Sequence, residues 1–165
     1  MSEPGMTNEV ILLRLLLAAV IGGILGYERS ARGSSKAIGM AGMMLVALGS
    51  STYMMLALHE AVSDRSAIGR AIQSMLQGIG FLAGAVIFKG GSDVRGIKTA
   101  ATVWITSGIG LATGTGFWWL GVIVGGATAL ILFLTDLFPA QERQEEPTDD
   151  TADRAMGNVS SPRER

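Results

Sequence analysis

The chain has 165 residues, of which 48% are apolar and 16% are charged, and its formal net charge is −1. Its mean hydropathy of +0.41 and its apolar blocks exceed what a soluble domain of this length needs, which predicts a small polytopic membrane protein. The chain contains no cysteine, which excludes disulfides, thiolate metal sites and cysteine nucleophiles.

Five apolar segments are each long enough to be a transmembrane helix, which needs about 20 residues. The N-terminal segment 1–9 is acidic, unlike a signal peptide, so we expect the first apolar segment to be retained. Residues 139–165 are polar and charged, which predicts a disordered tail after a transmembrane domain at 10–138. The sequence thus predicts an all-α fold with five spans, near Val10–Tyr27, Ala37–Leu58, Ile72–Phe88, Thr99–Gly114 and Phe117–Phe138.

A single arginine, Arg14, lies one turn inside the first span. A charge in the middle of a membrane costs at least about 2.5 kcal/mol. Two arrangements would avoid this cost: the long side chain reaches the membrane interface, or it forms a buried ion pair. The sequence leaves both open.

Rows of small or polar residues follow helical spacing within four of the spans. Small residues four apart allow helix backbones to approach closely in lipid, so one interpretation is that these rows are packing seams. The other interpretation is a polar conduit between the third and fourth spans. The packing candidates are Gly22, Gly26, Gly80, Gly84 and Gly110, and the conduit candidates are Gln73, Gln77, Thr99, Thr102 and Thr106.

Basic residues in the short joints predict the orientation of the chain, because Lys and Arg resist translocation. Three lie in or near the joint after the first span and three in the joint after the third, against two after the second and none before the last. We therefore expect the N-terminus outside and the C-terminus in the cytoplasm.

Charged residues gather near the predicted cytoplasmic ends of the helices. They could form internal ion pairs, such as Glu28 with Arg95 or Asp93 with Arg29. Alternatively, the carboxylates could bind a hard cation such as Mg²⁺, although the surrounding basic side chains make that a poor site. No catalytic residues, metal ligands or cofactor motif are found, so we expect no enzyme activity. The functional candidates are Glu28, Arg29, Arg32, Asp93, Arg95 and Lys98.

Two segments resemble the MgtC/SapB family of membrane proteins: GGILGYERSARG at 22–33 and QGIGFLAGAVIFKGGSDVRGIKTAATVWITSGIGLATG at 77–114. The resemblance implies a multi-pass protein of the bacterial inner membrane, associated with adaptation to low magnesium and with virulence. It also implies action on other membrane proteins, including the ATP synthase. From the residues themselves we expect no cofactor and no nucleic acid. A homo-oligomer is a further expectation.

The chain departs from this family at two places. Ala41 and Gly42 stand where relatives have an arginine and a threonine, and the tail is too short to be the cytoplasmic domain of longer relatives. Our leading hypothesis is a modulator of membrane machinery under magnesium or acid stress. The alternative is a small ion transporter or channel that uses the polar residues of the third and fourth spans.

We predict that a reporter fused after Pro139 is cytoplasmic and that one inserted near Asp64 is outside, because the basic joints stay inside. Alkaline phosphatase and green fluorescent protein fusions measure this directly. Opposite signals from the two sites would contradict the orientation.

Overall fold

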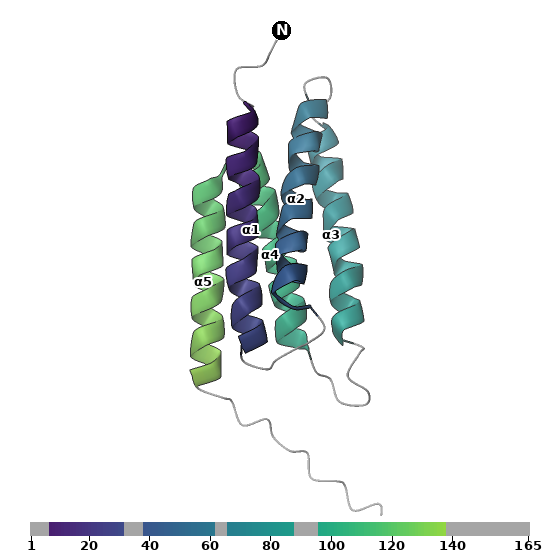
Figure 1. Cartoon of the computed structure of the whole chain (residues 1–165). Helices are drawn as coiled ribbons and strands as arrows, with labels where there is room; N and C mark the ends of the chain where they lie inside the picture. Colours follow the sequence, from purple (N-terminus) through teal and green to yellow (C-terminus); the bar gives the residue numbers. More distant parts are fainter. Residues whose placement is uncertain (1–6, 32–37, 62–65, 88–95, 138–165) are drawn as a thin grey trace, which may run out of the picture.

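A computed structural model describes residues 7–31, 38–61, 66–87 and 96–137. These residues form five helices and no strand, which confirms the all-α prediction, whereas the inside and outside assignment of the ends stays a prediction. The helices in Figure 1 are α1 (Asn8–Ala31), α2 (Met40–Glu60), α3 (Ser66–Ile87), α4 (Ile97–Thr115) and α5 (Trp118–Leu137).

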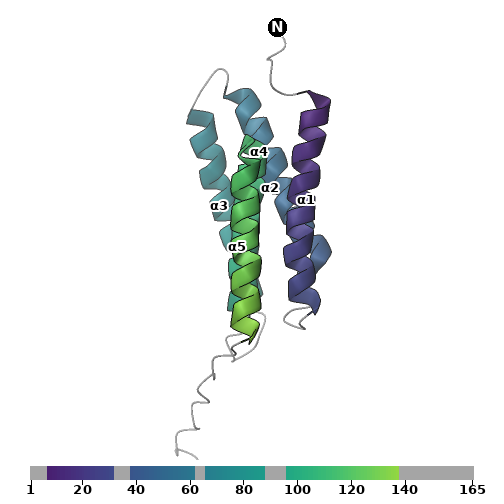
Figure 2. The same ribbon diagram turned by 90° about the vertical axis from the view of Figure 1, so that its left-hand side faces the viewer.

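The helices alternate in direction, so that the C-terminal ends of α1, α3 and α5 lie at the same end of the bundle as the N-terminal ends of α2 and α4 (Figure 1). Helix α4 contacts all four other helices. Around it, α5 packs on α1, α1 on α2 and α2 on α3, whereas the described residues of α3 and α5 do not touch. Figure 2 shows α4 directly behind α5, with α3 and α1 on opposite sides.

Helix α4 differs from the other four in composition. Helices α1, α2, α3 and α5 are long and apolar enough to cross a membrane, whereas α4 is not among them. Ten of its 19 residues are buried, compared with two of 22 in α3. Most hydroxyl-bearing residues of α4 are therefore covered by neighbouring helices, which explains how a helix of this composition fits within a membrane bundle.

The helix ends differ from the predicted spans. Helix α1 continues to Ala31, and α3 begins at Ser66 rather than Ile72, because backbone hydrogen bonds continue beyond the apolar run. The two residues that separate the predicted fourth and fifth spans form a tight turn: Gly116 has a φ of 92° and its N–H donates to the Thr113 carbonyl at 3.0 Å. Only glycine adopts this left-handed conformation readily.

Glycines allow the backbones of α1 and α4 to approach α2 closely. A Cβ atom at Gly22 would lie 2.7 Å from the Met43 carbonyl oxygen, and one at Gly110 would lie 2.4 Å from the Ala47 carbonyl oxygen. Gly26 and Gly114 make similar approaches to α2. Three of the five predicted packing glycines, Gly22, Gly26 and Gly110, therefore lie at close helix contacts.

The other two predicted packing glycines, Gly80 and Gly84, have open space around them. A Cβ at either position would meet nothing within 4 Å among the described residues. Helix α3 instead packs through Ile79, which lies in one apolar cluster with Met43 of α2 and Val103 of α4. Within the described bundle aliphatic side chains therefore take the packing role on α3, and the prediction that Gly80 and Gly84 form a packing seam stays a prediction.

Arg14 bonds to a backbone carbonyl in place of the predicted buried ion pair, whereas its reach to the membrane interface stays a prediction. Its guanidinium donates a hydrogen bond to the Gly114 carbonyl oxygen at 2.9 Å, at the C-terminal end of α4. The last carbonyl groups of a helix have no partner within the helix and carry partial negative charge. The arginine is thus stabilised by the end of a neighbouring helix rather than by a carboxylate.

We predict that Gly110→Ala destabilises the protein by about 1–3 kcal/mol, because its methyl group would overlap the backbone of α2. Gly108→Ala is the matched control, since a Cβ two residues away meets nothing within 4 Å. Its free energy of unfolding should stay equal or rise slightly, as alanine favours helix. Unfolding in mixed micelles measures both, and equal effects would contradict the close contact.

Candidate functional site

The buried face of α4 carries hydroxyl groups that have partners inside the bundle. Ser107 shares a 2.9 Å hydrogen bond with Ser50 of α2, and Thr106 donates to the Met43 sulfur at 3.8 Å. Thr102 donates to the Lys98 carbonyl oxygen of its own helix at 2.7 Å. Ser107 and Thr106 therefore link α4 to α2, whereas the Thr102 hydroxyl is satisfied within α4.

The predicted polar conduit between α3 and α4 is not formed. Thr99, Thr102 and Thr106 are buried, but Gln73 and Gln77 are exposed on the outward face of α3. The prediction assumed that the polar side of α3 turns inward. In the structure the aliphatic side turns inward, because aliphatic side chains fill the gap against α2 and α4 more completely.

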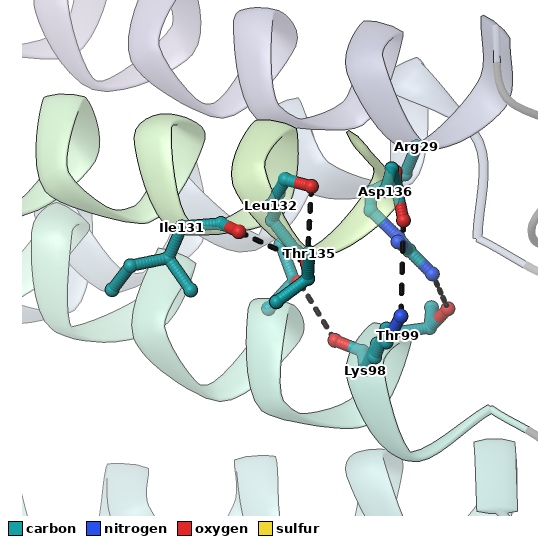
Figure 3. A network of polar contacts seen from close by, with 8 residues as sticks. Arg29, Lys98, Thr99, Ile131, Leu132, Thr135 and Asp136 are labelled. Atoms are coloured by element: carbon teal, nitrogen blue, oxygen red, sulfur yellow. Dashed lines mark hydrogen bonds and ion pairs between the residues drawn. The ribbon is translucent and has the colours of Figure 1, made fainter. Parts of the chain in front are cut away.

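Polar and charged side chains from three helices meet at the other end of α4 (Figure 3). Arg29 of α1 is only 2% exposed and donates a hydrogen bond to the Thr99 hydroxyl at 3.1 Å. Lys98 of α4 forms an ion pair with Asp136 of α5 at 3.7 Å. Glu28 lies beside Arg29 in sequence and is partly buried. We call Glu28, Arg29, Lys98, Thr99 and Asp136 the charged end.

The ion pair of the charged end is accessible to water. The Lys98 side chain is 56% exposed and that of Asp136 is 23% exposed. Such a pair contributes about 0–1 kcal/mol, so it orients α5 against α4 more than it stabilises the fold.

Sequence reasoning missed Asp136. It is the only charged residue of α5, in the last turn of an otherwise apolar helix. A carboxylate at a helix C-terminus is disfavoured by the helix dipole, so its presence there indicates a nearby cation. That signal was readable in the sequence, but the identity of the cation, Lys98, required the tertiary structure.

Three predicted site residues, Arg32, Asp93 and Arg95, lie outside the described residues. The predicted ion pairs that involve Asp93 or Arg95 therefore stay predictions. Among the residues that the structure describes, no group of three or more His, Asp or Glu side chains is placed to hold a metal ion.

Five packed helices, four of them long and apolar enough to cross a membrane, define a multi-pass α-helical membrane protein. Residues 15–140 match the MgtC family. The chain belongs to this family.

Several relatives are similar to this chain. Protein SrpB of Synechococcus elongatus is 38% identical over 132 residues, which are 72% of this chain and 71% of SrpB. Protein MgtC of Brucella abortus is 37% identical over 60% of this chain and 40% of that protein. Protein YhiD of Escherichia coli K12 is 33% identical over 77% of this chain and 60% of YhiD. The matched part thus covers less than two thirds of MgtC and YhiD. No solved structure is significantly similar to the chain.

We predict that Thr99→Val lowers the free energy of unfolding by about 1.5–3 kcal/mol, because it removes the hydroxyl that accepts from the buried Arg29. Thr135→Val is the matched control, since the Thr135 hydroxyl donates only to carbonyls of its own helix. Its effect should stay within about 0.5 kcal/mol. Equal losses in both variants, measured by unfolding in mixed micelles, would show that Arg29 does not depend on Thr99.

Proposed function

We propose that this protein modulates other machinery of the bacterial inner membrane during adaptation to low Mg²⁺ or to acid, without enzyme activity of its own. Membership of the MgtC family supports a role linked to magnesium. The name of one relative, YhiD, contains the words magnesium transporter. The absence of a nucleophile with a base from the sequence supports a non-enzymatic role.

The observation that carries this proposal is the close packing of α4 against α2. At Gly110 and Gly114 even an added methyl group would overlap the α2 backbone. A hydrated ion needs far more space than a methyl group, so this contact supports a rigid scaffold rather than a conduit. The transport alternative also loses its expected path, because Gln73 and Gln77 face away from α4.

The charged end is the part of this scaffold that we assign to a partner. It places Lys98 and Asp136 on a rigid base at one end of the bundle, and both side chains reach water. Exposed charges on a fixed base favour specific recognition of a partner more than they raise affinity. Arg32, Asp93 and Arg95 belong to the same proposal by their positions in the sequence. The partner is another membrane protein, for which the family resemblance suggests the ATP synthase.

We predict that Lys98→Ala impairs growth at low Mg²⁺ in a bacterial strain that depends on this chain in place of its own MgtC-family protein. Arg95→Ala should act in the same direction, and both variants should accumulate normally in the membrane. Arg70→Ala is the matched control, because it removes an exposed basic side chain at the opposite end of the bundle. Growth curves and immunoblots of membranes measure both quantities. Normal growth with both Lys98→Ala and Arg95→Ala would contradict the proposal that the charged end binds a partner.

A flux measurement separates the modulator from a transporter. The purified chain in liposomes that contain a Mg²⁺-sensitive dye should leave the membranes as tight as empty liposomes. Saturable Mg²⁺ entry that depends on the protein would contradict the proposal and favour transport.

A further inference from the structure

Helix α3 presents two amide side chains on its outward face. Gln73 and Gln77 are exposed, and neither forms a hydrogen bond with the described part of the chain. Other outward polar residues behave differently: the hydroxyls of Thr52 and Thr135 donate to carbonyl groups of their own helices. A glutamine carries two donors and a two-fold acceptor on its amide, so α3 has hydrogen-bonding groups that the fold leaves unused.

The position of Gln77 places one of these amides near the middle of the membrane. It lies 11 residues after Ser66 and 10 residues before Ile87, the two ends of α3. A helix of 22 residues is about 33 Å long, close to the thickness of the hydrocarbon core, about 30 Å. No water is present at that depth to satisfy a polar group, so an amide exposed there requires a protein partner.

The same face of α3 can approach another helix closely. Gly80 and Gly84 follow Gln73 and Gln77 at spacings of three and four residues, which keeps all four on one side of the helix. A Cβ at either glycine meets nothing within 4 Å in the described bundle. Among the described helices α3 touches only α2 and α4, and this face is turned away from both.

We propose that a second copy of this chain covers this face, with α3 of one copy packed against α3 of the other. Two copies inserted in the same orientation place each glutamine at the same depth as its counterpart. A side-chain amide both donates and accepts hydrogen bonds, so the Gln77 side chains of the two copies supply each other's hydrogen-bond partners. A different protein would need a matching amide at the same depth. This contact is independent of the proposed function of the charged end.

The absence of cysteine from the chain allows a direct test. Single-cysteine variants at Gln73 and Gly84 are compared with Ser74 and Ala85, which adjoin them in sequence but point about 100° away around the helix. The purified full-length protein is reconstituted in liposomes, oxidised and separated on denaturing gels. We expect disulfide-linked dimers for Gln73→Cys and Gly84→Cys, and mainly monomers for Ser74→Cys and Ala85→Cys. Dimers at all four positions, or at none, would overturn the proposal.

A second measurement tests the amides themselves. Gln77→Leu should weaken dimerisation by about tenfold in lipid-dilution experiments, because the amide pair is lost. Gln77→Asn should keep most of the affinity, and Ser74→Leu should leave it unchanged. Gln77 and Ser74 are both exposed, so these three variants keep the interior of the bundle intact. Unchanged dimerisation of Gln77→Leu would also overturn the proposal. So would an unsubstituted chain that stays monomeric at high protein density in the liposomes.

Discussion

The structure depends on the need to keep the polar face of α4 away from lipid. Its buried face carries threonines and serines along most of its length, and it is the one helix of the five that is not apolar enough to cross a membrane. The bundle meets this need by placing α4 against all four other helices. Glycine makes the arrangement tight, because Gly110 and Gly114 allow the α4 backbone to rest on the α2 backbone. Close approach replaces the hydrophobic driving force that is absent between helices in lipid.

Two arginines of α1 hold α4 at opposite ends. Arg14 bonds to Gly114, and Arg29 bonds to Thr99. The separations are equal, since 29 − 14 = 15 and 114 − 99 = 15, so the antiparallel helices remain in register over about 22 Å. The helix dipole favours Arg14 at the C-terminal end of α4. At the N-terminal end it does not favour a cation, and there Arg29 has a hydroxyl acceptor while Lys98 has the carboxylate of Asp136.

This design keeps the hydroxyl groups of α4 inside and places other polar groups on the outside, at two separate surfaces. The charged end offers exposed charges at the end of the bundle, and α3 offers two amides within the membrane. Both surfaces suit contacts with other proteins. A membrane protein that acts through such contacts needs a rigid core more than a path through it, and the glycine contacts between α2 and α4 provide that rigidity.

The sequence by itself determined the number of helices, their approximate bounds and the short joint between Gly114 and Phe117, because long apolar runs and the glycines that interrupt them have strong local consequences. It also indicated the contacts at Gly22 and Gly110. Only the tertiary structure decided which face of each helix turns inward. Lipid tails and a protein interior are similarly apolar, so hydropathy cannot tell them apart, and the outward position of Gln77 was not predicted. The partners of Arg14 and Lys98 are far from them in sequence, and only the packing of α4 between α1 and α5 brings these groups together.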